Sequence, residues 1–158
     1  MQITSAMKMV SAAKLKRAQD AIVQMRPYAK KFNDILVNVA ASLDNSDHPM
    51  MKSNNGKNIL LIALSSNRGL CGGFNNNIVK EVNKTISNNP DKNYTVFTIG
   101  KKVNDVFKKS DLLTKIESLP LNPQTIWDDL NYNNSILISS KIITAFKENK
   151  FDQAYIVY

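Results

Sequence analysis

Apolar residues repeat along the first forty-three positions of the chain at alternating intervals of three and four. The repeat comprises Leu15, Ala18, Ile22, Met25, Ala29, Phe32, Leu36, Val39 and Leu43. Such spacing is the heptad pattern of a coiled-coil helix. A helix over residues 2–43 would be about 60 Å long at roughly 1.5 Å per residue. We therefore predict a long helical arm whose apolar seam packs against a partner outside its own domain.

Two irregularities modify this arm. Ile3, Met7 and Val10 form a second apolar stripe that is out of phase with the seam, so the contact face rotates around the helix near residues 11–14. Pro27 interrupts the backbone hydrogen bonds in mid-pattern, while the seam continues in phase beyond it. Because a proline inside a helix removes one hydrogen bond and crowds the preceding turn, we expect a bend at this point.

Residues 44–57 are rich in turn-forming residues and carry almost no apolar pattern. We interpret this segment as a linker, which divides the chain into a shaft helix at 1–43, the linker at 44–57 and a domain at 58–158. His48, the single histidine, lies in the linker beside a proline, and we assign it no chemistry.

Beyond the linker the pattern alternates between strand and helix. Strands are predicted at 58–64, 94–99, 112–116 (short and of ambiguous period) and 154–158, and helices at 76–88, 101–109 and 124–149. The run IleLeuLeuIleAlaLeu within 58–64 is typical of a strand buried on both faces. Because helices between strands act as crossover connections, we predict an α/β fold with an open, mostly parallel, Rossmann-like sheet.

Composition narrows the class of protein. The chain has 158 residues, a net charge of +8 and one cysteine, Cys71, which we expect to be a small buried thiol. A lone cysteine cannot form an internal disulfide, and the sequence shows no apolar run of about 20 residues and no signal peptide, so we expect a soluble protein in a reducing compartment. The arm concentrates the positive charge, with seven lysines and arginines against two aspartates. A basic surface attracts nucleic acid, anionic lipid or acidic protein, although a helix that buries its seam leaves only its flanks for phosphates.

One motif stands out after the first strand, SerSerAsnArgGlyLeuCysGlyGlyPheAsn at 65–75. Ligands of open α/β sheets bind at this end of the strands. The motif lacks the lysine of a phosphate-binding P-loop and the glycine spacing of a dinucleotide site. Cys71 has no histidine nearby to act as a base. We therefore predict no catalytic, cofactor-binding or metal-binding residues.

The residues also carry a family resemblance. The stretch at 3–15, IleThrSerAlaMetLysMetValSerAlaAlaLysLeu, is followed by ArgProTyrAla at 26–29 and then by the motif at 65–75. These segments, in this order, resemble the γ subunit of F-type ATP synthases, and the likeness extends to AspGlnAlaTyrIleValTyr at 152–158. Family members are longer at both ends and continue into a second long helix, so we expect this sequence to be a fragment.

The resemblance implies a role as a rotor shaft. It implies that the missing helix is the antiparallel partner of the seam and that the coiled coil turns inside a hexamer of α and β subunits. The α/β domain would then lie against the ε subunit and the ring of c subunits. The β subunits would present a carboxylate-rich loop to Met7, Lys8, Lys14, Arg17 and Arg68. For Arg68 the alternative is a structural hydrogen bond to carbonyls of its own loop. Asn67 stands where the family often has an aspartate and offers no carboxylate.

The same resemblance implies a non-catalytic subunit without a cofactor, coupling ion flow to ATP synthesis. Its location would be peripheral, on the cytoplasmic face of the bacterial inner membrane. Without the second helix, the seam is expected to pair copies of the chain. Two other hypotheses about function stay open. The first is a free-standing α/β binding module with a basic coiled-coil arm, whose binding to nucleic acid would depend on salt. The second is a small Rossmann-like enzyme, whose folded state a nucleotide would stabilise.

Overall fold

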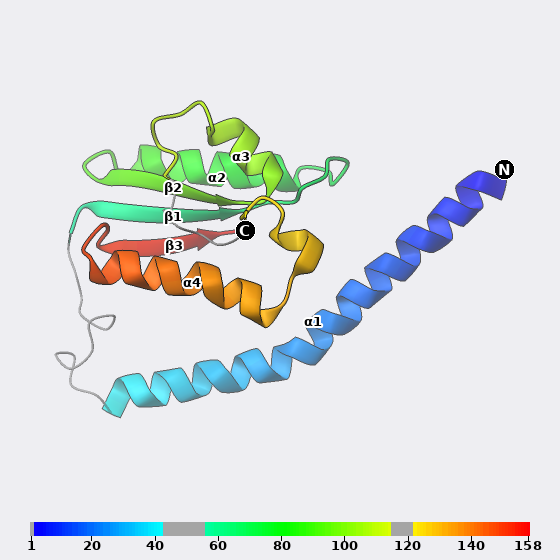
Figure 1. Cartoon of the computed structure of the whole chain (residues 1–158), viewed down its shortest axis with the longest axis horizontal. Coiled ribbons are helices and arrows are strands. Elements are labelled where there is room, and N and C mark those ends of the chain that lie inside the picture. The colour runs from blue at the N-terminus through cyan, green and yellow to red at the C-terminus, as the bar shows by residue number, and fades with distance from the viewer. Residues whose placement is uncertain (1, 43–55, 115–121) are drawn as a thin grey trace. The chain divides into compact units, whose positions relative to one another are not determined.

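The computed structural model describes residues 2–42, 56–114 and 122–158 (Figure 1). The chain divides into two compact units, Met1–Ser53 and Asn54–Tyr158. Most of the predicted linker, together with Leu43 and His48, lies outside the described residues.

The described residues of the first unit form one helix, α1 (Gln2–Ser42), of 41 residues and about 62 Å at roughly 1.5 Å per residue. The predicted helix is thus confirmed up to Ser42. The seam side chains from Leu15 to Val39 are exposed, and the large ones range from 48% for Val39 to 64% for Met25. Pro27 lies inside the helix, and the ribbon of α1 changes direction about halfway along its length (Figure 1). The helix therefore continues through the proline, and its apolar seam is left uncovered.

The second unit is built on a parallel sheet of three strands, β1 (Asn58–Leu64), β2 (Asn93–Ile99) and β3 (Gln153–Val157). The strand order is β2-β1-β3, with Leu61 opposite Val96 on one side and Tyr155 on the other. The five residues at 59–63 are all buried, as expected for a central strand of a parallel sheet. The predicted parallel α/β fold is confirmed.

Helices cover both faces of this sheet (Figure 1). On one face, α2 (Phe74–Asn88) and α3 (Lys101–Phe107) pack on alternate β1 residues such as Leu61, through Val82 and Val103. On the other face, α4 (Tyr132–Lys147) packs Ile138 on the remaining β1 residues, together with Phe151. The alternation of β1 side chains thus forms two separate apolar clusters. At the β3 edge, by contrast, Tyr155 and Ile156 are more than half exposed.

The helix predicted at 124–149 is wrong as a single element. Residues 126–129 form a short 3-10 helix, η2 (Ile126–Asp129), and α4 begins only at Tyr132. Between them Asn131 is extended, and its side-chain oxygen accepts a 2.9 Å hydrogen bond from the Asn134 N–H. The Asn134 amide in turn donates to the Asp129 carbonyl at 2.8 Å. These local side-chain bonds compete with the helical backbone and start a new helix.

The strand predicted at 112–116 is wrong within the described residues. Leu113 forms an isolated parallel bridge with Val96 beside β2, through the Val96 N–H to the Leu112 carbonyl and the Thr114 N–H to the Val96 carbonyl. Residues 115 and 116 lie outside the described residues. Because only one pair of residues aligns, the contact does not extend the sheet by a full strand.

The cap of α4 can be tested by substitution. Asn131→Ala removes the side-chain acceptor for the Asn134 N–H and should lower the free energy of unfolding by about 1 kcal/mol. The control is Asn133→Ala, on the exposed first turn of the same helix, which should be neutral or stabilising by up to about 0.5 kcal/mol. Urea unfolding of the two variants measures the difference, and equal midpoints would contradict the assigned cap.

Candidate functional site

The segment at 65–73 connects the carboxyl end of β1 to α2. The chain runs from β1 to β2 on one side of the central strand and later returns to β3 on the other side. The carboxyl end of β1 is therefore the point at which the connections diverge, where open α/β sheets form a crevice. The motif predicted to lie at this end of the strand does so.

Asn75 at the start of α2 holds the connecting loop in shape. Its side-chain oxygen accepts from the Ser66 N–H at 3.1 Å. Its amide nitrogen donates to the Arg68 carbonyl at 3.3 Å and to the Cys71 sulfur at 3.0 Å. The Ser66 hydroxyl also donates to the Arg68 carbonyl, at 2.6 Å. The loop is thus closed by its own polar side chains, and its outward residues are presented on a defined backbone.

Ser65 joins this loop to two other segments. Its N–H donates to the Ile99 carbonyl at 2.8 Å, and its hydroxyl oxygen accepts from the Val103 N–H at 2.9 Å. Its carbonyl accepts from the indole N–H of Trp127 at 2.8 Å. Gly100 passes so close that a Cβ at this position would collide with the Ser65 carbonyl oxygen, and its φ is 96°. Only glycine fits there without strain.

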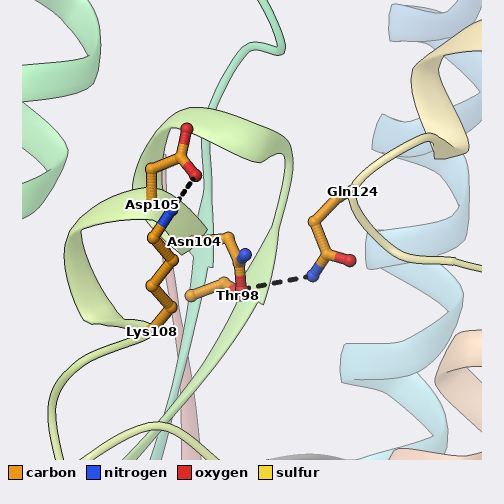
Figure 2. A network of polar contacts seen from close by, with 5 residues as sticks. All are labelled: Thr98, Asn104, Asp105, Lys108 and Gln124. Atoms are coloured by element: carbon orange, nitrogen blue, oxygen red, sulfur yellow. Dashed lines mark hydrogen bonds and ion pairs between the residues drawn. The ribbon is translucent and has the colours of Figure 1, made fainter.

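A polar network fixes the neighbouring edge of the sheet (Figure 2). The buried Thr98 hydroxyl donates to the side-chain oxygen of Asn104 at 3.0 Å, and Gln124 donates to the same oxygen at 3.4 Å. The Gly100 N–H adds a backbone bond to the Pro123 carbonyl at 3.1 Å. These bonds tie the segment before η2 to β2 and α3, which places Trp127 over Ser65.

Asp105 and Lys108 pair on the outer side of α3, with 2.9 Å between the Lys108 Nζ and a carboxylate oxygen (Figure 2). The hydrogen bond from Lys108 lowers the pKa of Asp105 below its ordinary value of 3.8, and the charges of Lys108, Lys101 and Lys102 act in the same direction. The pair is largely exposed, so its contribution to stability is small and screened by salt.

Arg68 is exposed at the outer side of the loop. Its guanidinium forms no ion pair or hydrogen bond with any residue that the structure describes. Among the described residues no hydrogen bond from this guanidinium to a carbonyl of its own loop is observed, while the Arg68 carbonyl itself accepts from the Ser66 hydroxyl and the Asn75 amide. The guanidinium is therefore available to an external partner.

Met7, Lys8, Lys14 and Arg17 are all exposed on α1. At about 100° per residue, Met7 and Lys14 share one face, with Lys8 to one side and Arg17 to the other. The four side chains thus cover about half of the helix circumference. They belong to the first unit and Arg68 belongs to the second, so each group is a separate candidate contact surface.

The prediction of a buried thiol at Cys71 is wrong. The cysteine is exposed, because the loop turns outward through Leu70 and Gly72, each with a φ of 60°. Its sulfur accepts the Asn75 amide hydrogen bond at the loop surface. The Cys71 side chain therefore belongs to the hydrogen-bonded surface of the loop and not to the apolar core.

A cleft of about 610 Å³ opens beside this loop. It is lined by Leu64, Ser65, Ser66, Asn67, Arg68, Phe74, Trp127, Asp128 and Tyr158. Sequence reasoning missed Trp127, because it placed this residue inside a long helix remote from the motif. The signal that was available is that Trp127 is the single tryptophan of the chain, but nothing in its spacing points to Ser65.

The described ranges give two further findings. They contain no group of three or more histidine, cysteine, aspartate or glutamate side chains placed to hold a metal ion. None of the helices within them is long and apolar enough to cross a membrane.

A family model described as ATP synthase matches residues 1–158. The chain belongs to the ATP synthase gamma chain family. It is 42% identical over 160 residues to the ATP synthase gamma chain of Christiangramia forsetii and 44% identical over 159 residues to that of Flavobacterium psychrophilum. Each match covers 100% of this chain and 54% of the relative. The gamma chain of Geotalea uraniireducens is 38% identical over 159 residues, covering 99% of this chain and 53% of the relative.

The chain thus spans about half the length of the curated gamma chain relatives it matches. The match includes both the long helix and the α/β unit, since it runs from one end of the chain to the other. The family resemblance read from the residues at 3–15 and 65–75 is confirmed.

The close approach at Gly100 predicts a large effect on stability. Gly100→Ala places a methyl group against the Ser65 carbonyl in a backbone conformation that alanine avoids, so the free energy of unfolding should fall by more than about 2 kcal/mol. Gly69→Ala, in the loop after β1, has no neighbour within 4 Å of its Cβ and should change stability by less than about 0.5 kcal/mol. Thermal or urea unfolding compares the two, and a tolerated alanine at 100 would contradict the packing described.

The lowered pKa of Asp105 predicts a pH dependence. A carboxyl whose pKa is lower in the folded state stabilises the protein above its unfolded pKa and loses this contribution as pH falls through the folded pKa. Asp105→Asn should therefore lower the urea midpoint slightly at pH 7, and the difference from wild type should shrink as pH falls below 3.8. Asp111→Asn, after the end of α3, serves as the control. A difference that grows on acidification would contradict the pairing with Lys108.

Proposed function

We propose that this chain is a central shaft subunit of an F-type ATP synthase, which couples ion-driven rotation to conformational change at the catalytic β subunits. The observation that carries the proposal is the match of the whole chain to ATP synthase gamma chains. The exposed seam of α1 supports it, because a helix of this length with an uncovered heptad face needs a partner along its axis. The partner would be a second helix in antiparallel orientation.

The proposal includes a set of contacts. Met7, Lys8, Lys14 and Arg17 on α1, and Arg68 on the loop after β1, would meet a carboxylate-rich loop of the β subunit. Their exposure supports this assignment. Exposed ion pairs contribute about 0–1 kcal/mol each, which suits contacts that must break and form again as a shaft turns.

Further partners would be the α subunits of the hexamer, the ε subunit and the ring of c subunits. The chain would have no catalytic site of its own and no cofactor, since ATP turnover would take place between α and β subunits. Its location would be peripheral, on the cytoplasmic face of the bacterial inner membrane. The division at 1–43, 44–57 and 58–158, and the pairing of isolated copies through the seam, stay predictions.

Calorimetry with the cognate ε subunit tests the assignment, because that contact would be made by the α/β unit. We expect one-to-one binding that changes little between about 0.15 M and about 0.5 M salt, since a largely apolar contact is not screened. Binding that disappears at the higher salt would indicate a purely electrostatic surface. If a demonstrably folded chain does not bind ε at all, the proposed function fails and the free-standing binding module becomes the better reading.

A further inference from the structure

Three segments that are far apart in the sequence meet at the carboxyl edge of the sheet. They are the loop after β1 at 65–67, the first turn of α3 at 101–104, and an η2 segment at 122–127 that leads into and includes the start of η2. Each segment is hydrogen-bonded to the other two. These bonds form a closed circuit, which is called the edge ring below.

The loop supplies the hydrogen-bond acceptors for the start of α3. This helix has only seven residues, and no side chain at its own N-terminus caps it. Three of its backbone N–H groups donate instead to three consecutive loop residues, Lys101 to the Asn67 side chain at 2.9 Å, Lys102 to the Ser66 carbonyl at 3.2 Å and Val103 to the Ser65 hydroxyl at 2.9 Å. Because so short a helix is not stable alone, its first turn depends on the loop.

The η2 segment binds both α3 and the loop. The Gln124 side chain donates to the side-chain oxygen of Asn104 on α3 at 3.4 Å (Figure 2). The Gly100 N–H, directly before α3, donates to the Pro123 carbonyl at 3.1 Å. On the other side, the indole N–H of Trp127 donates to the loop at 2.8 Å. The ring is thereby closed.

Ser65 is the junction of the edge ring. It is 2% exposed, and its three polar groups bind three different segments. Its N–H donates to the Ile99 carbonyl of β2, its hydroxyl oxygen accepts from the Val103 N–H, and its carbonyl accepts from the Trp127 indole. A buried polar group that loses its partner is costly, because water does not replace the lost bond. Displacement of one segment therefore leaves unpaired groups that the others share.

We propose that the edge ring is one cooperative conformational unit, in which the loop, the first turn of α3 and the η2 segment open and close together. A change in one segment is transmitted to the other two, although they are distant in the sequence. Arg68 follows Asn67 directly in the chain, so its position is set by α3 and the η2 segment as well as by its own loop. This inference does not depend on the function proposed above.

Native-state hydrogen exchange measured by NMR tests the cooperativity. Asn67→Ala removes only the acceptor of the Lys101 N–H. In a cooperative unit, exchange at the Lys102 and Val103 amides and at the Trp127 indole N–H should also accelerate, each by about threefold to fivefold. The indole is a clean reporter, because Trp127 is the single tryptophan of the chain. Acceleration confined to the Lys101 amide would overturn the inference, since the bonds would then open independently.

Trp127→Phe tests the ring from the opposite side. It removes the indole donor while every acceptor of the α3 first turn remains. Exchange at the Lys101 amide should still accelerate by about threefold to fivefold, and an unchanged rate there would overturn the inference.

Three controls separate this unit from a general loss of stability. Asn67→Asp keeps an acceptor at the start of α3 and adds a negative charge there, so exchange should stay at the wild-type rate or become slower. Asn76→Ala, at an exposed position on α2, should change none of the rates. The Leu61 amide in the central strand reports unfolding of the whole α/β unit. Equal acceleration at Leu61 in Asn67→Ala or Trp127→Phe would show global unfolding and overturn the proposal of a local unit.

Discussion

Complete burial of the central strand is the constraint on which the α/β unit depends. The five residues at 59–63 have no polar side chain and lie between two parallel neighbours, so both faces must be covered by helices. Parallel neighbours also require crossover connections. To meet both requirements, the chain crosses from one face of the sheet to the other between strands. The loop after β1 then lies at the carboxyl edge of the sheet. The cleft beside Arg68 is therefore a by-product of how the core is buried.

The parts of the fold that could be predicted are those in which one physical signal dominates. The continuous apolar run of β1 and the heptad seam of α1 each have a single satisfactory structure. The break before α4 could not be predicted from periodicity, because it depends on the side-chain bonds that link Asn131 and Asn134 to Asp129. The apolar spacing lapses there, since Asn133 and Asn134 stand three and four residues after Leu130, but a short polar gap does not by itself end a helix. The local competition for backbone donors is what interrupts it.

The candidate site was predictable to a similar degree. Arg68 lies in a motif that can be recognised from consecutive residues, so its exposure at the end of β1 could be anticipated. The contribution of Trp127 could not, since the bond between its indole and Ser65 joins positions far apart in the chain and depends on the way Gly100 and Pro123 bring the two segments together. Cys71 was misjudged because its type favours burial, whereas the turn through Leu70 and Gly72 carries it outward.

The proline inside α1 has a mechanical consequence. Pro27 has no amide hydrogen, so one turn of a 41-residue helix lacks a longitudinal bond that every neighbouring turn possesses. Elastic stiffness is lowest where such bonds are missing, and strain applied between the two ends of the helix concentrates at that turn. The turn at Pro27 is therefore the most compliant point of α1, and it separates the N-terminal part of the helix, with Met7, Lys8, Lys14 and Arg17, from the C-terminal part that precedes the second unit in the sequence.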